Sequence, residues 1–199
     1  MGKPFLFHEA ALPEGFPPPG PIDRIVVKDY PACRLARVRG GADGVPGGAN
    51  GMFGPLFNHI KRHDIPMTAP VEIGYAVVSL EGGGVPAAES MAFLYGRPTR
   101  GATGPDGADP RVTVEDVPAM TVVSIGVRGS YTDGRFARAL GRLTDWLSSP
   151  GQRYRPAGPP RYLGYNSPFV PGFLRYGEVQ LPIEPVDGPP PGEGASAVR

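Results

Sequence analysis

The stretch His63-Asp64-Ile65-Pro66-Met67-Thr68-Ala69-Pro70-Val71 decides the fold, because two prolines four residues apart exclude a helix across it. Each proline also favours extended backbone in the residue before it. Before the stretch, apolar residues recur at the helical spacing i, i+3, i+4, i+7: Phe53, Leu56, Phe57 and Ile60. A strand-like run over residues 71–80 follows it. The sequence therefore predicts a rigid corner that joins a helix to a strand.

The composition is typical of a folded domain with generous loops. The chain has 199 residues, with 30 glycines and 27 prolines. These concentrate in a few stretches, including 40–54 and 150–172. A chain of this length forms one domain or at most two. We expect an N-terminal extension over residues 1–21, a domain over 22–184 and a disordered tail over 185–199.

Charge and apolar patterning narrow the class of partner. Twenty basic and 19 acidic residues create no strong field for nucleic acid, so we expect a small hydrophobic or aromatic ligand instead. The single cysteine, Cys33, rules out an internal disulfide. No apolar run is long enough to span a bilayer, and the N-terminus lacks the pattern of a secretory signal. We therefore expect a soluble, cytoplasmic protein.

Two weak internal matches indicate a duplicated domain. Tyr30-Pro31-Ala32 recurs as Val117-Pro118-Ala119, and Val38-Arg39-Gly40 recurs as Val127-Arg128-Gly129, at nearly the same spacing. A helical pattern follows each Val-Arg-Gly copy, and strand-like segments surround both helices. The predicted fold is α+β: two pseudo-repeats, about 22–95 and 111–184, forming a curved antiparallel sheet or barrel of about eight strands with two main helices. A groove where the halves meet is the expected ligand site, unless side chains fill it.

Three separated motifs resemble the SOUL/haem-binding-protein family. They are the corner with the helix before it, the run from Val127 to Asp133, and the closing run from Tyr165-Asn166-Ser167-Pro168-Phe169 to Ile183. The resemblance implies a twisted antiparallel barrel with two helices that binds haem and related tetrapyrroles. It also implies a fold shared with the GyrI-like effector-binding domains. The chain departs from the family pattern at Arg175-Tyr176-Gly177-Glu178, which leaves the identity of the ligand open.

Haem, the candidate cofactor, requires a large apolar slot and either an axial donor or cations for its propionates. On the first helix Met52, His59 and His63 share one flank beside the apolar stripe that contains Leu56. His59 or His63 is therefore the candidate haem-iron ligand. The alternative is that both histidines are solvated.

The two histidines also have the i, i+4 spacing of a helical zinc pair. The surrounding sequence supplies no further ligand, so we predict no other metal site.

An aromatic loop near the end of the domain is the other expected ligand contact. Phe169 and Phe173 are candidates to cover a flat ligand, and Arg175 is placed to meet a carboxylate. The alternative is that these rings pack one end of the barrel.

Glu178 carries the alternative function. Strand alternation places Glu178 in phase with Tyr176 and Gln180, opposite the apolar residues of the same strand. The resemblance to GyrI-like domains implies a glutamate that faces the ligand cavity and, in some members, helps to hydrolyse natural products. Glu178, with the hydroxyls of Tyr165 and Tyr75, is then the candidate catalytic group of a hydrolase that acts on an aromatic compound. A position at the solvent surface is the other alternative.

Overall fold

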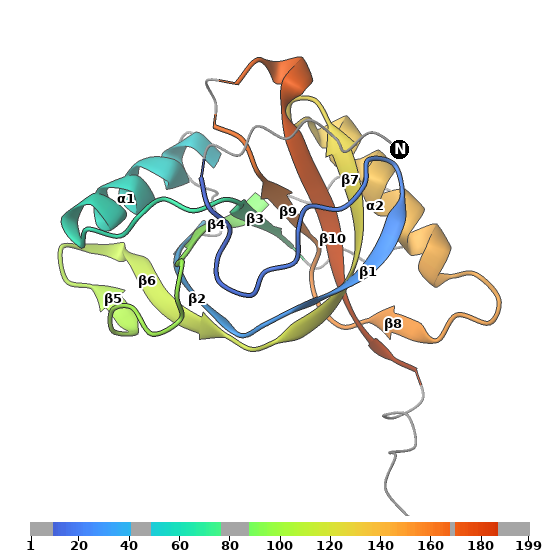
Figure 1. Ribbon diagram of the computed structural model, residues 1–199, viewed down its shortest axis with the longest axis horizontal. Helices are drawn as coiled ribbons and strands as arrows, with labels where there is room; N and C mark the ends of the chain where they lie inside the picture. Colours follow the sequence, from blue (N-terminus) through green and yellow to red (C-terminus); the bar gives the residue numbers. More distant parts are fainter. Residues whose placement is uncertain (1–9, 41–48, 77–87, 168–169, 187–199) are drawn as a thin grey trace, which may run out of the picture.

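The computed structural model describes residues 10–40, 49–76, 88–167 and 170–186 (Figure 1). Residues 187–199, which form most of the predicted tail, lie outside these ranges. Two helices accompany the sheet, α1 (Ala49–Arg62) and α2 (Asp133–Leu147), together with one turn of 3-10 helix (Gly172–Leu174). The strands are β1 (Ile25–Tyr30), β2 (Cys33–Arg39), β3 (Val71–Tyr75), β4 (Ala88–Leu94), β5 (Gly104–Asp106), β6 (Asp109–Val117), β7 (Met120–Arg128), β8 (Tyr154–Pro156), β9 (Arg161–Gly164) and β10 (Tyr176–Pro185).

The strands form one antiparallel sheet, which confirms the predicted α+β class and its duplication. The strand order is β1-β7-β10-β9-β3-β4-β2-β6-β5, with β8 paired to β10. From β1 to β6 this order is symmetric about the β3–β9 pair: β3 corresponds to β9, β4 to β10, β2 to β7 and β6 to β1. Each half therefore lends its first strand to the edge of the other half, and the sheet stays open rather than closing into a barrel.

In the described residues the sheet has ten strands, against the predicted number of about eight, and the additional strands are short. β5 and β8 have three residues each, too few for a pattern of alternation to stand out. β9 follows Pro159 and Pro160 and has only four residues. β9 is a strand because it pairs with β3 and β10, and these contacts form only in the tertiary structure.

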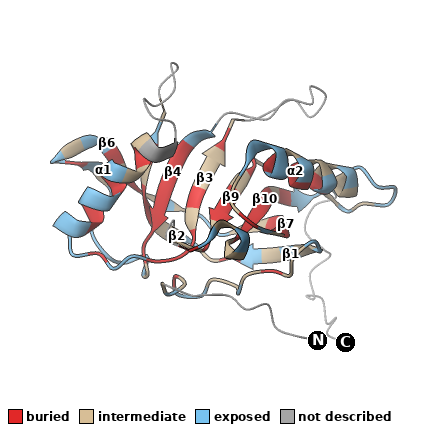
Figure 2. Ribbon diagram, turned by 90° about the horizontal axis from the view of Figure 1, so that it is seen from above, coloured by how far each residue is buried: buried red, intermediate tan, exposed pale blue. Residues whose placement is uncertain are grey.

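Both helices cover the same face of the sheet, which we call the helix face. α1 packs Met52, Leu56 and Ile60 against apolar residues of β2, β4 and β6. α2 packs Phe136, Ala139 and Leu143 against β7, β9 and β10. Figure 1 shows the helices at opposite ends of the sheet, and Figure 2 shows the mostly buried strands between them.

The opposite face is covered by residues 10–22, which we call the N-terminal strap. Leu12, Phe16 and Ile22 pack against buried residues of β1, β7, β9 and β10, and the ring of Phe16 meets that of Tyr30 edge to face at 5.0 Å. Figures 1 and 2 show the strap crossing this face of the sheet, which we call the strap face. Much of the expected N-terminal extension is therefore part of the packed domain.

The corner at 63–71 has the predicted role. α1 ends at Arg62, Asp64 adopts a positive φ of 48°, and β3 begins at Val71. The Thr68 hydroxyl donates to the Leu94 carbonyl at 2.5 Å, and the Ala69 amide donates to the Ala11 carbonyl at 3.0 Å. The corner thus connects helix to strand and also holds the start of the strap.

Candidate functional site

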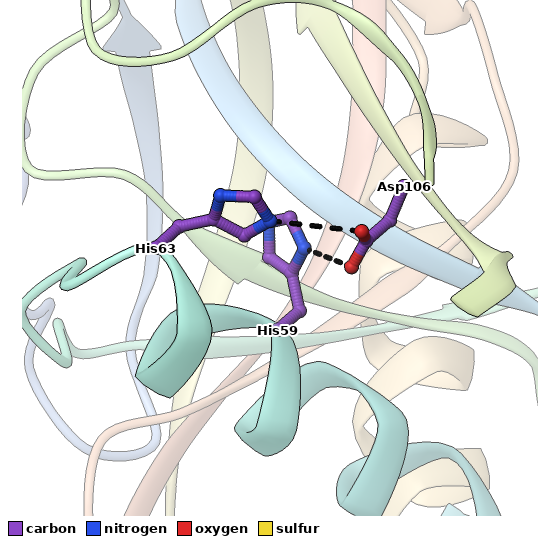
Figure 3. A group of neighbouring side chains, drawn as sticks. All are labelled: His59, His63 and Asp106. Atoms are coloured by element: carbon purple, nitrogen blue, oxygen red, sulfur yellow. Dashed lines mark hydrogen bonds and ion pairs between the residues drawn. The ribbon is translucent and has the colours of Figure 1, made fainter. Parts of the chain in front are cut away.

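The first candidate site lies where the end of α1 meets the β5–β6 turn. His59 Nδ1 lies 2.7 Å from Asp106 Oδ2, and His59 Nε2 lies 2.7 Å from the Tyr95 hydroxyl. His63 directly follows α1; its Nε2 lies 3.6 Å from Asp106 Oδ1, and the two imidazole rings are 4.6 Å apart (Figure 3). Helical spacing brings the histidines together, and the hairpin brings the carboxylate to them.

The Asp106 carboxylate is held on several sides. Burial alone would raise the pKa of Asp106, but hydrogen bonds from the Ala108 amide, His59 and Arg62 outweigh it and lower this pKa well below its ordinary value. The Ala108 amide donates to Oδ1 at 3.0 Å, and the Arg62 guanidinium contacts Oδ2. Asp106 is therefore an ionised carboxylate that is held in place beside the end of α1.

A pocket of about 370 Å³ opens beside this cluster. Its walls are His59, His63, Ile65, Tyr95, Val114 and the loop 100–107. This volume falls within the range of about 300–1,000 Å³ that small-molecule sites occupy. A second pocket, lined by four arginines near α2, has only about 160 Å³. The pocket beside α1 is the better size for an organic ligand.

The candidate ligand-binding residues predicted on the first helix have different environments in the structure. Met52 and Leu56 are 1% and 0% exposed and pack in the core beneath the helix. His59 is 3% exposed and both its ring nitrogens have partners. Both histidines line the pocket, and His63, with a side chain 50% exposed, is the one open to solvent.

The second candidate site surrounds Glu178, which lies on the strap face and is 0% exposed. Its Oε1 accepts from the Gly20 amide, from Lys28 Nζ at 2.7 Å and from the Tyr176 hydroxyl at 3.1 Å. Its Oε2 accepts from Ser124 Oγ at 2.9 Å and from Gln180 Nε2 at 2.7 Å. Five groups of the chain therefore surround the carboxylate, and the strap contributes one of them.

The tyrosines proposed beside Glu178 lie on different faces. Tyr165 is buried on the strap face, and its ring lies 5.4 Å from that of Tyr176. Tyr75 is buried on the helix face, 4.0 Å from the ring of Phe136. Burial and the nearby Glu178 carboxylate raise the pKa of Tyr176, so its hydroxyl stays protonated and donates. Tyr176, rather than Tyr75, is the hydroxyl in contact with Glu178.

The proposed aromatic loop is described only in part. Phe169 lies outside the described residues. Phe173 is 72% exposed, and Arg175 Nε donates to the Val170 carbonyl at 2.9 Å.

A row of paired polar side chains continues from Glu178 across the strap face. Gln180 Oε1 accepts from Arg161 Nε at 3.0 Å, and Arg161 Nη1 lies 2.9 Å from Glu72 Oε2. Glu72 Oε1 lies 3.1 Å from Nη2 of Arg37. The Nε of the same arginine lies 2.5 Å from Glu115 Oε1. Burying charges is costly unless they are paired, and here each charge has a partner from a neighbouring strand. These charges are paired within the chain, although the buried Nη2 of Arg161 has no hydrogen-bond partner in the described residues.

Sequence reasoning missed several members of both clusters. Asp106 and Tyr95 are 47 and 36 residues from His59 along the chain, and no local spacing connects them. Lys28 and Ser124 reach Glu178 from 150 and 54 residues away. The alternation that placed Tyr176 and Gln180 on the side of Glu178 was the one usable signal, and the structure agrees with it.

Comparison with solved structures supports the fold. EcmrR in complex with DNA superposes with a TM-score of 0.61 at 16% identity, covering 82% of this chain and 58% of that one. The isolated EcmrR C-terminal domain gives 0.55 at 15% identity and covers 82% and 98%. A hydrolase from Listeria innocua gives 0.56 at 13% identity and covers 83% and 94%. At these identities the likeness shows the fold alone.

Comparison with protein sequences gives the family. No curated protein matches the chain at a significant level. None of the helices in the described residues has the length and apolar character to cross a bilayer. A family model described as SOUL heme-binding protein matches residues 23–182, which span both halves of the sheet and both helices. This chain is therefore a member of the SOUL haem-binding protein family, and a ligand-binding protein by that membership.

Proposed function

We propose that this protein binds haem, or another large, flat hydrophobic ligand, in the pocket between α1 and the loop 100–107. The observation that carries the proposal is a pocket of about 370 Å³ with a half-exposed imidazole, His63, in its wall. The family is one of haem-binding proteins, which makes haem the first ligand to test.

The residues of the pocket fit such a ligand. Ile65 and Val114 offer an apolar surface, and the buried ring of Tyr95 adds an aromatic one. Arg100 lines the same pocket, and a guanidinium there suits a propionate carboxylate. Haem would supply an iron that takes a nitrogen ligand, and His63 is the residue placed to provide it.

His63 is a better candidate than His59 for physical reasons. A ligand atom must have a free lone pair that faces the pocket. His59 uses both ring nitrogens in buried contacts with Asp106 and Tyr95, so binding iron would break at least one of them. The ring nitrogen of His63 is held more loosely, since its Nε2 lies 3.6 Å from Asp106 Oδ1.

Binding without turnover is the favoured form of the proposal. A general base must reach a water molecule or substrate, and Glu178 is 0% exposed beneath the strap. A substrate would have to displace the Gly20 amide and compete with Lys28 for the carboxylate. No feature of this cluster favours the hydrolase alternative.

The test is a titration of haem into the purified protein, followed by the Soret band. We expect saturable binding and a band that shifts in His63→Ala. Ala102→Trp, which places a large ring in the wall of the pocket, should weaken binding without removing a polar group. Asn58→Ala, an exposed change on the same helix, is the matched control and should bind as the parent does.

Two results would contradict the proposal. One is haem binding that is unchanged in both His63→Ala and Ala102→Trp, which would place the ligand elsewhere. The other is the failure of haem and of a panel of flat aromatic compounds to raise the melting temperature of the protein, since a ligand that binds the native state must stabilise it.

A further inference from the structure

The side chains at the end of α1 bring together three donors that metal ions prefer. One ligand atom from each of His59, His63 and Asp106 can be chosen so that all three lie within 4.8 Å of one another. His59 lies in the last turn of α1, and His63 follows the end of the helix, where its amide donates to the His59 carbonyl at 3.1 Å. Asp106 is fixed by the Ala108 amide at the β5–β6 turn. For the three atoms to hold one ion, the half-exposed His63 side chain would turn and the Arg62 guanidinium would leave Asp106.

We propose that His59, His63 and Asp106 form a binding site for a divalent first-row transition-metal ion of the class of Zn²⁺ and Co²⁺. Two imidazole nitrogens and one carboxylate oxygen are a common three-residue ligand set for these ions. The cluster forms part of the pocket wall, so a fourth position would be open to water or to a ligand in the pocket.

The surrounding contacts suit this role. A histidine that binds a metal usually donates its other N–H to a neighbouring oxygen, which fixes the ring. The Tyr95 hydroxyl, 2.7 Å from His59 Nε2, provides that oxygen. His59 would then bind through Nδ1, where the ion takes the place of the hydrogen bond to Asp106, and the neutral ring carries its one proton on Nε2, facing the Tyr95 hydroxyl.

Arg62 is the competitor for this site. Its guanidinium contacts Asp106 Oδ2, so without a metal ion it neutralises the carboxylate. The Arg62 side chain is 36% exposed, which lets it turn toward solvent when an ion binds. Removing the guanidinium should therefore strengthen metal binding. If the cluster serves only as a salt bridge, the same change should not increase its affinity for a metal ion.

The experiment is a calorimetric titration of Zn²⁺ into the full, haem-free chain, repeated with Co²⁺ to record the visible spectrum of the bound ion. We expect one site per chain. His63→Ala and Asp106→Asn should each weaken Zn²⁺ binding by at least about tenfold, in line with the effect of losing a metal-site contact. Arg62→Gln should bind more tightly than the parent. His8→Ala, which removes the third histidine of the chain, is the matched control and should have no effect.

Circular dichroism of each variant separates loss of the site from loss of the fold, and His63→Ala removes an exposed side chain that the core does not need. The proposal is overturned if Zn²⁺ does not bind to the parent, or if the variants at His63 and Asp106 bind it as the parent does. The metal-site proposal is tested independently of haem binding, because the titration contains no haem. A failure of haem to bind would not change the result of the Zn²⁺ titration.

Discussion

Neutralising Glu178 while keeping its size gives a sharp test of how this carboxylate is used. Glu178→Gln removes the negative charge that Lys28 faces at 2.7 Å, inside a cluster where the two side chains are 0% and 8% exposed. The glutamine also brings an N–H₂ group into a space where five neighbours already donate. The change therefore leaves a largely buried ammonium without its carboxylate, with the neutral Pro18 carbonyl at 2.9 Å as a remaining acceptor.

The expected cost is large. Breaking a buried ion pair by removing one partner costs about 3–5 kcal/mol, because the remaining charge is uncompensated. Domains of this size lose about 2–4 °C in melting temperature for each kcal/mol. We expect Glu178→Gln to melt about 6–20 °C below the parent. The double variant Lys28→Met/Glu178→Gln should cost less than the sum of its two single changes, since it removes both charges.

The assay is equilibrium unfolding in urea at neutral pH, with thermal melting as a second probe. Glu184→Gln on the same strand is the matched control, because its side chain is 48% exposed and pairs with Arg155 at the surface. That control should change the free energy of unfolding by less than about 1 kcal/mol.

A Glu178→Gln variant as stable as the parent, or more stable, would refute this reasoning. Groups that serve a ligand or substrate are often held at a cost to stability, so their removal tends to be neutral or stabilising. That result would reopen the hydrolase alternative for Glu178.

Three further predictions concern packing, the strap and pH. Gly177→Ala places a methyl group against the ring of Tyr162 and should cost about 1–3 kcal/mol by thermal melting, whereas Gly141→Ala meets no atom within 4 Å and should not destabilise. Phe16→Ala should loosen the strap, so that its hydrogen-bonded amides, such as those of Glu14 and Gly20, exchange hydrogen faster while the core amides are unaffected. Burial alone would raise the pKa of Glu115, but two arginines of β2 outweigh it and lower this pKa below its ordinary value of about 4.5. The stability that ionised Glu115 contributes is therefore complete above about pH 4.5, and it is lost as the pH falls through the pKa of the folded state. Glu115→Gln should therefore unfold more easily at pH 7 and lose less stability below about pH 4.5 than the parent, measured by urea unfolding across pH.

Much of the fold could be predicted from local rules. Two prolines ended α1 and started β3, apolar spacing placed both helices, and weak repeats indicated the two halves. These signals act between residues close in the chain, or between copies of one pattern. The short strands β5, β8 and β9 escaped prediction because long-range pairing, rather than their own residues, makes them strands.

The candidate sites were predictable only as single residues. His59, His63 and Glu178 were chosen from the sequence as residues able to do chemistry. Their surroundings come from elsewhere in the chain: Asp106 from a hairpin, and the Gly20 amide from the strap, 158 residues before Glu178.

The sequence by itself determined the family, the α+β class and the helix that ends between the two histidines, because periodicity and proline act locally. Tertiary structure alone decided which histidine is open to solvent, that the Asp106 carboxylate stands beside both, and that Glu178 is enclosed by its own chain. The physical reason is that a side chain's chemistry depends on its solvent access and its partners, and in an antiparallel sheet those partners come from strands that are distant in sequence.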